Sequence, residues 1–382
     1  MKTLWSTIIF LLSLLLVGSY FFFKVPAKKE AKSIKTISST DTIKEKEKEK
    51  EKEKEKEKEK EIDYTAVAQK LEQYLKDKQF NGSVLVSYQG RTILNKGYGY
   101  ADVQKQIENT PQTKYRIGSI TKTTVAVSIL QLQEQGKLNI QDNVNTYIPS
   151  FPANKNITLY HLLTHTSGLP EHGKGKVNAS SRLSLMTWLG RQPTAFQPGS
   201  GWLYSDYNYM VLAYIVEKLS GQSLAQYVTN HIFIPAGMTE SGMGETPTGD
   251  ANFSKGYKKK ENELVLAPKL AMNWLYGCGE MYTTVNDMKK LDEAIMTGKL
   301  ISAESLKLML TPSSEKKYAF SLYIYPDYYH NHGVLPGWNT FNNLNWDKQL
   351  FVIAFSNVQN GIDDGFNNEF RKLVSDLLEK RG

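Results

Sequence analysis

The segment 121–135 constrains the fold most, because it reads as a helix that is apolar around most of its circumference. A helix without a polar face must be enclosed by other elements, so it is expected at the centre of a core. Gly136 is typical of a residue that ends a helix. The apolar positions are Val125, Ala126, Val127, Ile129, Leu130 and Leu132.

Ser119 and Lys122 lie at the start of this helix. Residues three apart share a helix face, so the lysine amine can reach the serine hydroxyl. The free N–H groups of the first turn point to where an acyl oxygen would carry negative charge. Together these features predict an activated serine. The alternative is that Ser119 is an ordinary N-cap, a position that serine favours.

Composition limits the classes of function. The chain has 382 residues, of which 40% are hydrophobic, and a single cysteine, Cys278, so no disulfide can form within it. The formal charge is +8, but residues 1–61 hold 15 lysines and 11 acidic residues, which leaves +4 for the remainder. Without a dense basic run there, nucleic acid is not an expected partner.

The N-terminus predicts export. Residues 4–23 form an almost unbroken apolar run between Lys2 and Lys24. Twenty residues are about enough to cross ~30 Å of hydrocarbon as a helix, so residues 1–23 are interpreted as a transmembrane anchor. A cleaved signal peptide is the alternative, and the protein would then be secreted. Both interpretations place the rest of the chain outside the cell membrane.

A charged spacer follows this segment. Residues 44–61 alternate Lys and Glu without interruption. As a helix the spacer would place like charges at i and i+4, and it has nothing apolar to bury. Residues 24–62 are therefore predicted to be a disordered tether, and residues 63–382 to be the folded domain.

The folded part shows strand patterns at both ends and helices between them. The runs 83–88 and 91–96, joined by Gln89-Gly90, predict a hairpin. Further strand patterns occur at 320–325, 340–344 and 349–356, before an amphipathic closing helix. We expect an α/β fold of the α+β type, in which one antiparallel sheet is flanked by the terminal helices and a helical subdomain extends to about residue 245.

Several motifs accompany Ser119 and Lys122 in order along the chain. They are Lys96-Gly-Tyr-Gly-Tyr, Leu138-Asn-Ile-Gln-Asp, Tyr147-Ile-Pro-Ser-Phe, Tyr204-Ser-Asp, Gly277-Cys-Gly-Glu and His332-Gly333. The series resembles the serine β-lactamase and penicillin-binding-protein superfamily in its class C-like branch, over about residues 64–380. Within it, the chain is similar to the staphylococcal esterases that remove D-alanine from teichoic acids.

The resemblance implies a role for each matching residue. Ser119 would be the acylated nucleophile, and Lys122 would accept its proton. Tyr204 would relay protons to the leaving group and help to activate water. The backbone N–H groups of Ser119 and of Val334, beyond Gly333, would form the oxyanion hole. No metal and no organic cofactor is implied.

Two positions depart from the pattern. Asp206 stands where many relatives have Asn, and a carboxylate only accepts hydrogen bonds. It would bind the ammonium group of a D-alanyl ester or orient Lys122. In the third motif, where relatives have Lys or His, Asn331 stands between His330 and His332. His332 is chosen as the substrate-binding side chain, although a one-residue slip in a strand would reverse the choice.

Other reactive side chains receive structural interpretations. His161 and His165 have the i,i+4 spacing of a helical zinc pair but lack its acidic partner, so a hydrogen-bonded loop beside the site is expected. Cys278, between two glycines, is interpreted as a small buried filler because no base is paired with it.

The sequence therefore predicts a serine hydrolase anchored at the outer face of a bacterial membrane. Its expected substrates are cell-wall esters or amides that end in D-alanine, with teichoic-acid D-alanyl esters first. A D,D-carboxypeptidase or weak β-lactamase acting on peptidoglycan stems or penicillins is the alternative. A wall-binding or β-lactam-sensing protein that is acylated without turnover is a third hypothesis. The sequence does not indicate an oligomeric state.

Overall fold

The computed structural model describes residues 62–379, apart from 172–180, 248, 262 and 314–315. Contacts divide the chain into two units, 1–60 and 61–382, and the fold below is that of the second unit. The anchor and tether expected at 1–23 and 24–62 fall outside the described residues, except for Ile62. Within the described ranges, the helices are too short or too polar to span a bilayer.

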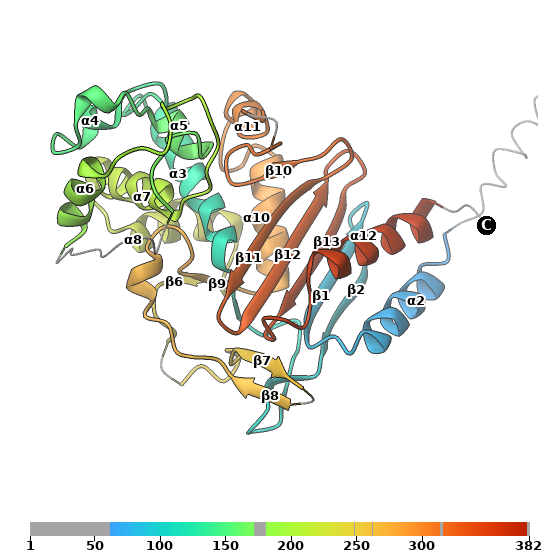
Figure 1. Ribbon diagram of the computed structural model, residues 1–382. Helices are drawn as coiled ribbons and strands as arrows, with labels where there is room; N and C mark the ends of the chain where they lie inside the picture. The colour runs from blue at the N-terminus through green and yellow to red at the C-terminus, as the bar shows by residue number, and fades with distance from the viewer. Residues whose placement is uncertain (1–61, 172–180, 248, 262, 314–315, 380–382) are drawn as a thin grey trace, which may run out of the picture. The chain divides into compact units, whose positions relative to one another are not determined.

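A six-stranded antiparallel sheet forms the centre of the domain (Figure 1). The sheet joins the N-terminal and C-terminal parts of the domain, because β1 pairs with β13. The pairing runs from Gly82 opposite Ser356 to Tyr88 opposite Leu350. The predicted pairing of terminal strands is thus confirmed. In sheet order, the strands are β10 (Tyr323–Ile324), β11 (Tyr329–Leu335), β12 (Trp338–Asn345), β13 (Leu350–Ser356), β1 (Gly82–Tyr88) and β2 (Arg91–Tyr98).

The hairpin between β1 and β2 turns at Gln89-Gly90, as predicted. Both residues have positive φ, 49° and 77°, which suits the right-handed twist of the flanking strands. The prediction missed β11. Its Tyr-His-Asn-His-Gly sequence lacks the β-branched residues that are typical of a strand. The segment is a strand because it pairs with β12.

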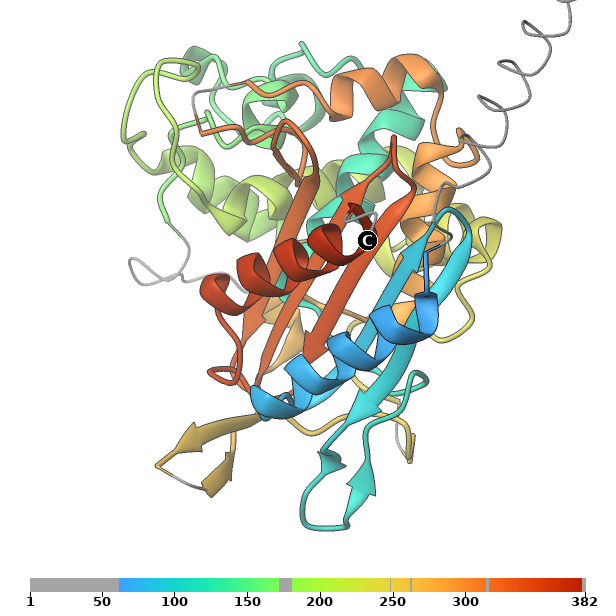
Figure 2. The ribbon, with the colours of Figure 1, turned by 90° about the vertical axis from the view of Figure 1, so that its right-hand side faces the viewer.

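Two terminal helices cover one face of the sheet, α2 (Tyr64–Asp77) and α12 (Asp364–Glu379) (Figure 2). Each buries one stripe of apolar side chains, as the helical spacing in the sequence predicts. Tyr74 and Phe370 stack between the two helices with ring centroids 5.6 Å apart. The buried members of the two stripes are Val67, Leu71, Leu75, Phe366, Phe370, Val374 and Leu378.

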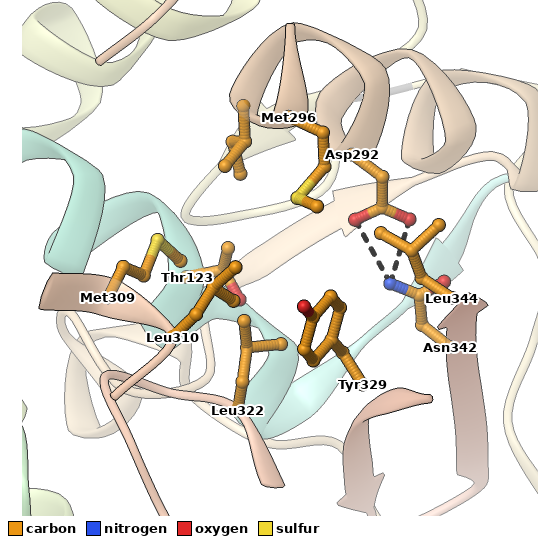
Figure 3. Close-up of a pocket in the computed structure, with 10 residues that line it drawn as sticks. Thr123, Asp292, Met296, Met309, Leu310, Leu322, Tyr329, Asn342 and Leu344 are labelled. Atoms are coloured by element: carbon orange, nitrogen blue, oxygen red, sulfur yellow. Dashed lines mark hydrogen bonds between the residues drawn. The ribbon is translucent and has the colours of Figure 1, made fainter. Parts of the chain in front are cut away.

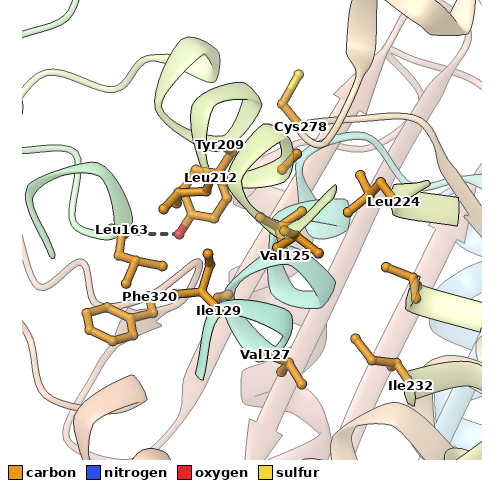
Figure 4. Close-up of a cluster of buried hydrophobic side chains, with 14 of the residues drawn as sticks. Val125, Val127, Ile129, Leu163, Tyr209, Leu212, Leu224, Ile232, Cys278 and Phe320 are labelled. Carbon is orange, nitrogen blue, oxygen red and sulfur yellow. Dashed lines mark hydrogen bonds between the residues drawn. The ribbon is translucent and has the colours of Figure 1, made fainter. Parts of the chain in front are cut away.

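The helical region lies on the other face, around α3 (Lys122–Glu134). Val125 and Ile129 of α3 are fully buried, and Figure 4 shows them among side chains from several other elements. The expected burial of an all-round apolar helix is confirmed. The remaining helices are α4 (Val144–Tyr147), α5 (Leu159–Leu163), α6 (Arg182–Arg191), α7 (Asp206–Ser220), α8 (Leu224–Val228), α9 (Ile234–Ala236), α10 (Val285–Met296) and α11 (Ala303–Met309).

Short elements connect the sheet to the helices. The most important is η1 (Gly118–Thr121), a 3₁₀ turn that leads directly into α3. A small sheet of β5, β9 and β6 supports it, because the N–H of Ile117 donates to the carbonyl of Met281. The others are β3 (Tyr100–Asp102), β4 (Ile107–Glu108), β5 (Tyr115–Arg116), β6 (Gly242–Met243), β7 (Tyr257–Lys260), β8 (Glu263–Leu266), β9 (Met281–Thr283), η2 (Ala153–Lys155), η3 (Thr229–Phe233) and η4 (Met272–Leu275).

Candidate active site

Ser119 lies in η1, one turn before α3, and is partly exposed between buried neighbours. In a 3₁₀ turn, residues i and i+3 lie almost directly above one another. The Nζ of Lys122, the first residue of α3, accordingly lies 3.0 Å from the Oγ of Ser119. The sequence predicted this contact from α-helical spacing, and the tighter turn produces it.

Lys122 is buried and has three acceptors for its three N–H donors. They are the Ser119 hydroxyl, the Cys278 carbonyl at 2.9 Å and Oδ1 of Asp206 at 2.7 Å. Burial alone lowers the pKa of Lys122, but Tyr204 and Asp206 raise it more, so the net pKa lies above the ordinary 10.5. At neutral pH the side chain is therefore an ammonium.

Tyr204 completes the arrangement from the loop before α7. Its hydroxyl lies 2.8 Å from the Oγ of Ser119, and the Nζ of Lys122 lies 5.0 Å from the centre of its ring. Burial raises the pKa of Tyr204, and the charge of Lys122 opposes that rise. In this bond the Tyr204 hydroxyl donates to Oγ of Ser119, which also accepts from Lys122.

His165 supports Tyr204 from behind, with ring centroids 4.3 Å apart. Its Nδ1 is 3.2 Å from the N–H nitrogen of Ser205 and 2.8 Å from Nδ2 of Asn208. Burial, together with the charge of Lys122, lowers the pKa of His165 well below 6.5, so the ring is neutral and accepts these bonds. The loop beside the site expected from the sequence is thus formed around His165.

His161 lies apart from these contacts. Its Nδ1 accepts the N–H of Thr158 at 3.2 Å and closes the capping box of α5. In the ranges that the structure describes, no three His, Cys, Asp or Glu side chains are grouped to hold a metal ion.

Asp206 is the first residue of α7, where the positive end of the helix dipole favours a carboxylate. Its side chain is 25% exposed, and Oδ1 faces Lys122. Of the two roles considered from the sequence, the structure places it in contact with the lysine.

The edge of β11 approaches η1 closely. A Cβ added to Gly333 would lie 1.7 Å from the carbonyl oxygen of Ile117, and one added to Gly118 would lie 2.9 Å from the nitrogen of Val334. Leu335 pairs with Trp338 across a two-residue turn, so the alternation of antiparallel bonds leaves the N–H of Val334 pointing away from β12, toward η1.

The third motif needs a correction. Asn331 faces α3, where its Nδ2 donates to Oγ1 of Thr123 at 3.0 Å. His332 points to the opposite face of the sheet. Its Nε2 lies 2.6 Å from Oδ1 of Asn339, and its ring stacks on Phe341 at 4.2 Å. The choice of His332 as the substrate-binding side chain is wrong, because alternation along the strand puts Asn331 and Gly333 on the side of Ser119.

Sequence reasoning missed the part that Cys278 plays through its backbone. The thiol is buried, and burial raises its pKa well above 9.0, which suits the predicted filler. The carbonyl of the same residue is an acceptor for Lys122. The flanking Gly277 and Gly279 were the available signal, since paired glycines indicate a tight turn.

A small cavity lies behind the site, between α3, α10 and β12 (Figure 3). It is lined mostly by apolar side chains, with Thr123 on the side of α3. Asp292 of α10 is 5% exposed there, and both its oxygens accept from Nδ2 of Asn342, at 3.2 and 3.0 Å. Burial raises the pKa of Asp292 to about 7.

Comparison with known proteins shows the family to which this chain belongs. Residues 67–375 match the Beta-lactamase family. The chain is 42% identical over 308 residues to the putative penicillin-binding protein PbpX of Bacillus subtilis, a match that covers 80% of this chain and 78% of PbpX. It is 32% identical over 320 residues to the teichoic acid D-alanine hydrolase of Staphylococcus aureus, with 82% and 78% covered.

A solved structure shows the same likeness. The crystal structure of FmtA from Staphylococcus aureus matches with a TM-score of 0.73 and 28% identity, over 82% of this chain and 89% of FmtA. The resemblance expected from the motifs is confirmed, as is the fold class. The chain belongs to the Beta-lactamase family and is a serine hydrolase of that family.

Proposed function

We propose that this protein is an esterase that removes D-alanine from esters on a teichoic acid, through an acyl-enzyme on Ser119. The observation that carries the proposal is the ion pair between Lys122 and Asp206, 2.7 Å apart beside the serine. The pair keeps Lys122 protonated, and Asp206 balances the charge of the ammonium. A protonated Lys122 cannot take the proton of Ser119, and the pair also bears on which substrate charge the site can bind.

The proton of Ser119 goes to Tyr204 in this mechanism. Because Lys122 is already protonated, it positions Oγ and does not act as the base. Burial raises the pKa of Tyr204, so its phenolate is the minor form at neutral pH, and the charge of Lys122 stabilises the fraction that accepts the proton. Ser119 attacks the ester carbonyl as its proton passes to the phenolate. The N–H groups of Ser119 and Val334 hold the negative oxygen that develops.

The leaving group and water complete the cycle. Tyr204 returns its proton to the departing alkoxide of the polymer, which leaves D-alanine bound to Ser119 as an ester. A water molecule then gives its proton to the Tyr204 phenolate and attacks that ester. Free D-alanine departs, and Ser119 regains its proton from Tyr204.

Charge supports a D-alanyl ester over the alternatives. The ammonium of such an ester can meet the carboxylate of Asp206, whose side chain is 25% exposed and which only accepts. D-Ala-D-Ala peptides and penicillins carry a carboxylate instead, and Asn331 offers no positive charge to it from β11. Lys122 is buried and its three N–H donors are engaged, so it offers no N–H to that carboxylate. The activity named for the Staphylococcus aureus relative supports the same choice.

We also propose that the enzyme works at the outer face of the cell membrane, held by residues 1–23 and spaced from it by residues 24–62. The apolar run 4–23 and the Lys-Glu repeat that follows it support this part of the proposal. Fractionation of cells, followed by protease digestion of intact protoplasts, tests it. A protein found only in the cytosol would contradict it.

Product analysis tests the substrate. The purified protein is incubated separately with D-alanylated teichoic acid, with a D-Ala-D-Ala peptide and with a chromogenic cephalosporin. We expect steady release of D-alanine from the teichoic acid and its loss in Ser119→Ala. Faster turnover of the peptide or the cephalosporin would favour the carboxypeptidase or β-lactamase function. A single burst of acylation without turnover would favour a sensor.

A further inference from the structure

The turn that carries the Cys278 carbonyl is fixed from two sides. Gly277, with φ of 68°, is pressed against α7, since an added Cβ would lie 2.4 Å from Cβ of Ala213. On the other side, Oε1 of Glu280 accepts the N–H of Gly277 at 3.0 Å. Cys278 follows Gly277, and its carbonyl accepts a hydrogen bond from Nζ of Lys122 at 2.9 Å. One hydrogen bond of Glu280 thus helps to fix an acceptor of the active-site lysine.

Glu280 is buried among charged groups from several elements. Arg182 at the start of α6, Glu217 of α7 and Arg116 of β5 face it, and the ring of Tyr276 lies 3.9 Å from the guanidinium carbon of Arg182. Burial raises the pKa of Glu280 to about 7, although the Gly277 N–H and the two arginines oppose the rise. Its carboxyl group therefore changes charge near neutral pH.

We propose that Glu280 is a positioning residue for the reaction at Ser119: its carboxylate holds the turn that presents the Cys278 carbonyl to Lys122, and its protonation slows acylation. This inference rests on the proposed acylation of Ser119. Protonation replaces a charge-assisted bond to Gly277 by a weaker one.

Protonation also adds an O–H beside groups that cannot all accept it. Arg116 and Arg182 only donate, so neither guanidinium accepts the new proton, and Glu217 is the acceptor that faces the group. The turn then holds the Cys278 carbonyl less firmly, and Lys122 is less well fixed against Ser119. Loss of activity at lower pH follows without any contact between Glu280 and the substrate.

The pH dependence of acylation tests the inference. The full-length protein reacts with a fluorophosphonate, which labels an activated serine without turnover, and intact mass gives the labelling rate from pH 5.5 to 8.5. We expect the wild-type rate to fall as the pH drops through about 7. Glu280→Gln keeps an acceptor oxygen but does not titrate. Its profile should lack the additional fall near pH 7, and its rate should lie within about tenfold of wild type at pH 8.

Glu245→Gln is the matched control. Oε1 of Glu245 accepts the N–H of Met272 at 3.0 Å, so it is also a carboxylate bound to the backbone of this segment. It is exposed, and its hydrogen bond is to Met272 and not to the Gly277 turn. This variant should keep the wild-type pH profile. Thermal melting at each pH verifies that every variant is folded.

A second variant keeps the test decisive if Glu280→Gln fails to fold. Arg182→Met removes an exposed cation that lowers the pKa of Glu280, so the midpoint of the profile should move to higher pH. An unchanged fall in Glu280→Gln, or an unmoved midpoint in Arg182→Met, would overturn the inference. Normal labelling profiles without release of D-alanine from teichoic acid would overturn only the proposed substrate.

Discussion

The Nζ of Lys122 lies 2.7 Å from Oδ1 of Asp206, and the pair lies beside the hydroxyl of Ser119. Two opposite charges therefore share a site in which one member is buried and the other is 25% exposed. Lys122 is enclosed by the protein, whereas part of the Asp206 side chain reaches the surface of the site. The proposed binding of a substrate ammonium rests on this difference in exposure.

Asp206→Asn tests that proposed binding. Together with Tyr204, Asp206 raises the pKa of Lys122, and the variant removes this contribution and the proposed acceptor for a substrate ammonium. We expect kcat/KM for a D-alanyl ester to fall by roughly 10- to 100-fold, the loss typical of a hydrogen bond to a charged group. The matching N-acetyl-D-alanyl ester, which has no ammonium, should lose less. Equal losses for both esters would contradict a role in ammonium binding.

Tyr204→Phe tests the route of the proton. The ring still packs on His165, so the fold should be preserved, but the oxygen 2.8 Å from Ser119 is lost. We expect kcat to fall by roughly 10²- to 10⁴-fold, the usual contribution of general acid–base catalysis. Tyr74→Phe, which removes a hydroxyl bonded to Glu369 on the surface, is the control and should retain activity. A fully active Tyr204→Phe would return the role of base to Lys122.

Periodicity and turn residues were sufficient to predict most of the fold. The apolar circumference of 121–135 predicted a buried helix, and Gln89-Gly90 predicted the hairpin. Strand β11 could not be predicted, because Tyr329–Leu335 is polar and becomes a strand only through its neighbour β12.

The site was predictable where side-chain type carries the chemistry. Ser119, Lys122, Tyr204 and Asp206 are brought together as their motifs suggested. The sequence could not predict to which face of the sheet Asn331 points, because the register of the strand decides it. The Cys278 carbonyl could not be foreseen either. Every residue has a carbonyl, and this one reaches Lys122 across 156 residues of chain.

Gly333→Ala tests the close approach of β11 to η1. An added Cβ would lie 1.7 Å from the backbone oxygen of Ile117, and a backbone atom cannot move aside as the end of a side chain can. We expect a loss of roughly 1–3 kcal/mol in the free energy of unfolding, together with activity lost even where the protein is folded.

Gly221→Ala is the control that separates the loss of stability in Gly333→Ala from its loss of activity. This glycine ends α7 with φ of 71° and has no atom within 4 Å of an added Cβ, so the substitution costs only backbone strain of about 1 kcal/mol. It should destabilise the protein yet leave the activity of the folded state intact. Full activity of Gly333→Ala would show that the spacing of Val334 and Ser119 does not matter.

Asp292→Asn should stabilise the protein in a pH-dependent way. The pKa of this buried acid rises from an ordinary 3.8 to about 7 on folding, so the folded state disfavours the carboxylate. Wild-type stability is fully present below about pH 4 and is lost as the pH rises toward 7. Each pKa unit corresponds to about 1.4 kcal/mol, so asparagine can recover up to roughly 4 kcal/mol at pH 8 and almost nothing at pH 4.

Urea unfolding of both proteins at pH 4 and pH 8 measures this difference directly. Asn342 still has an amide oxygen at position 292 to which it can donate, so the cavity in Figure 3 keeps its shape. Asp376→Asn on the partly exposed side of α12 is the control, and its effect should be small at both pH values. A gain in Asp292→Asn that is the same at pH 4 as at pH 8 would mean that the carboxyl group is not kept neutral by burial.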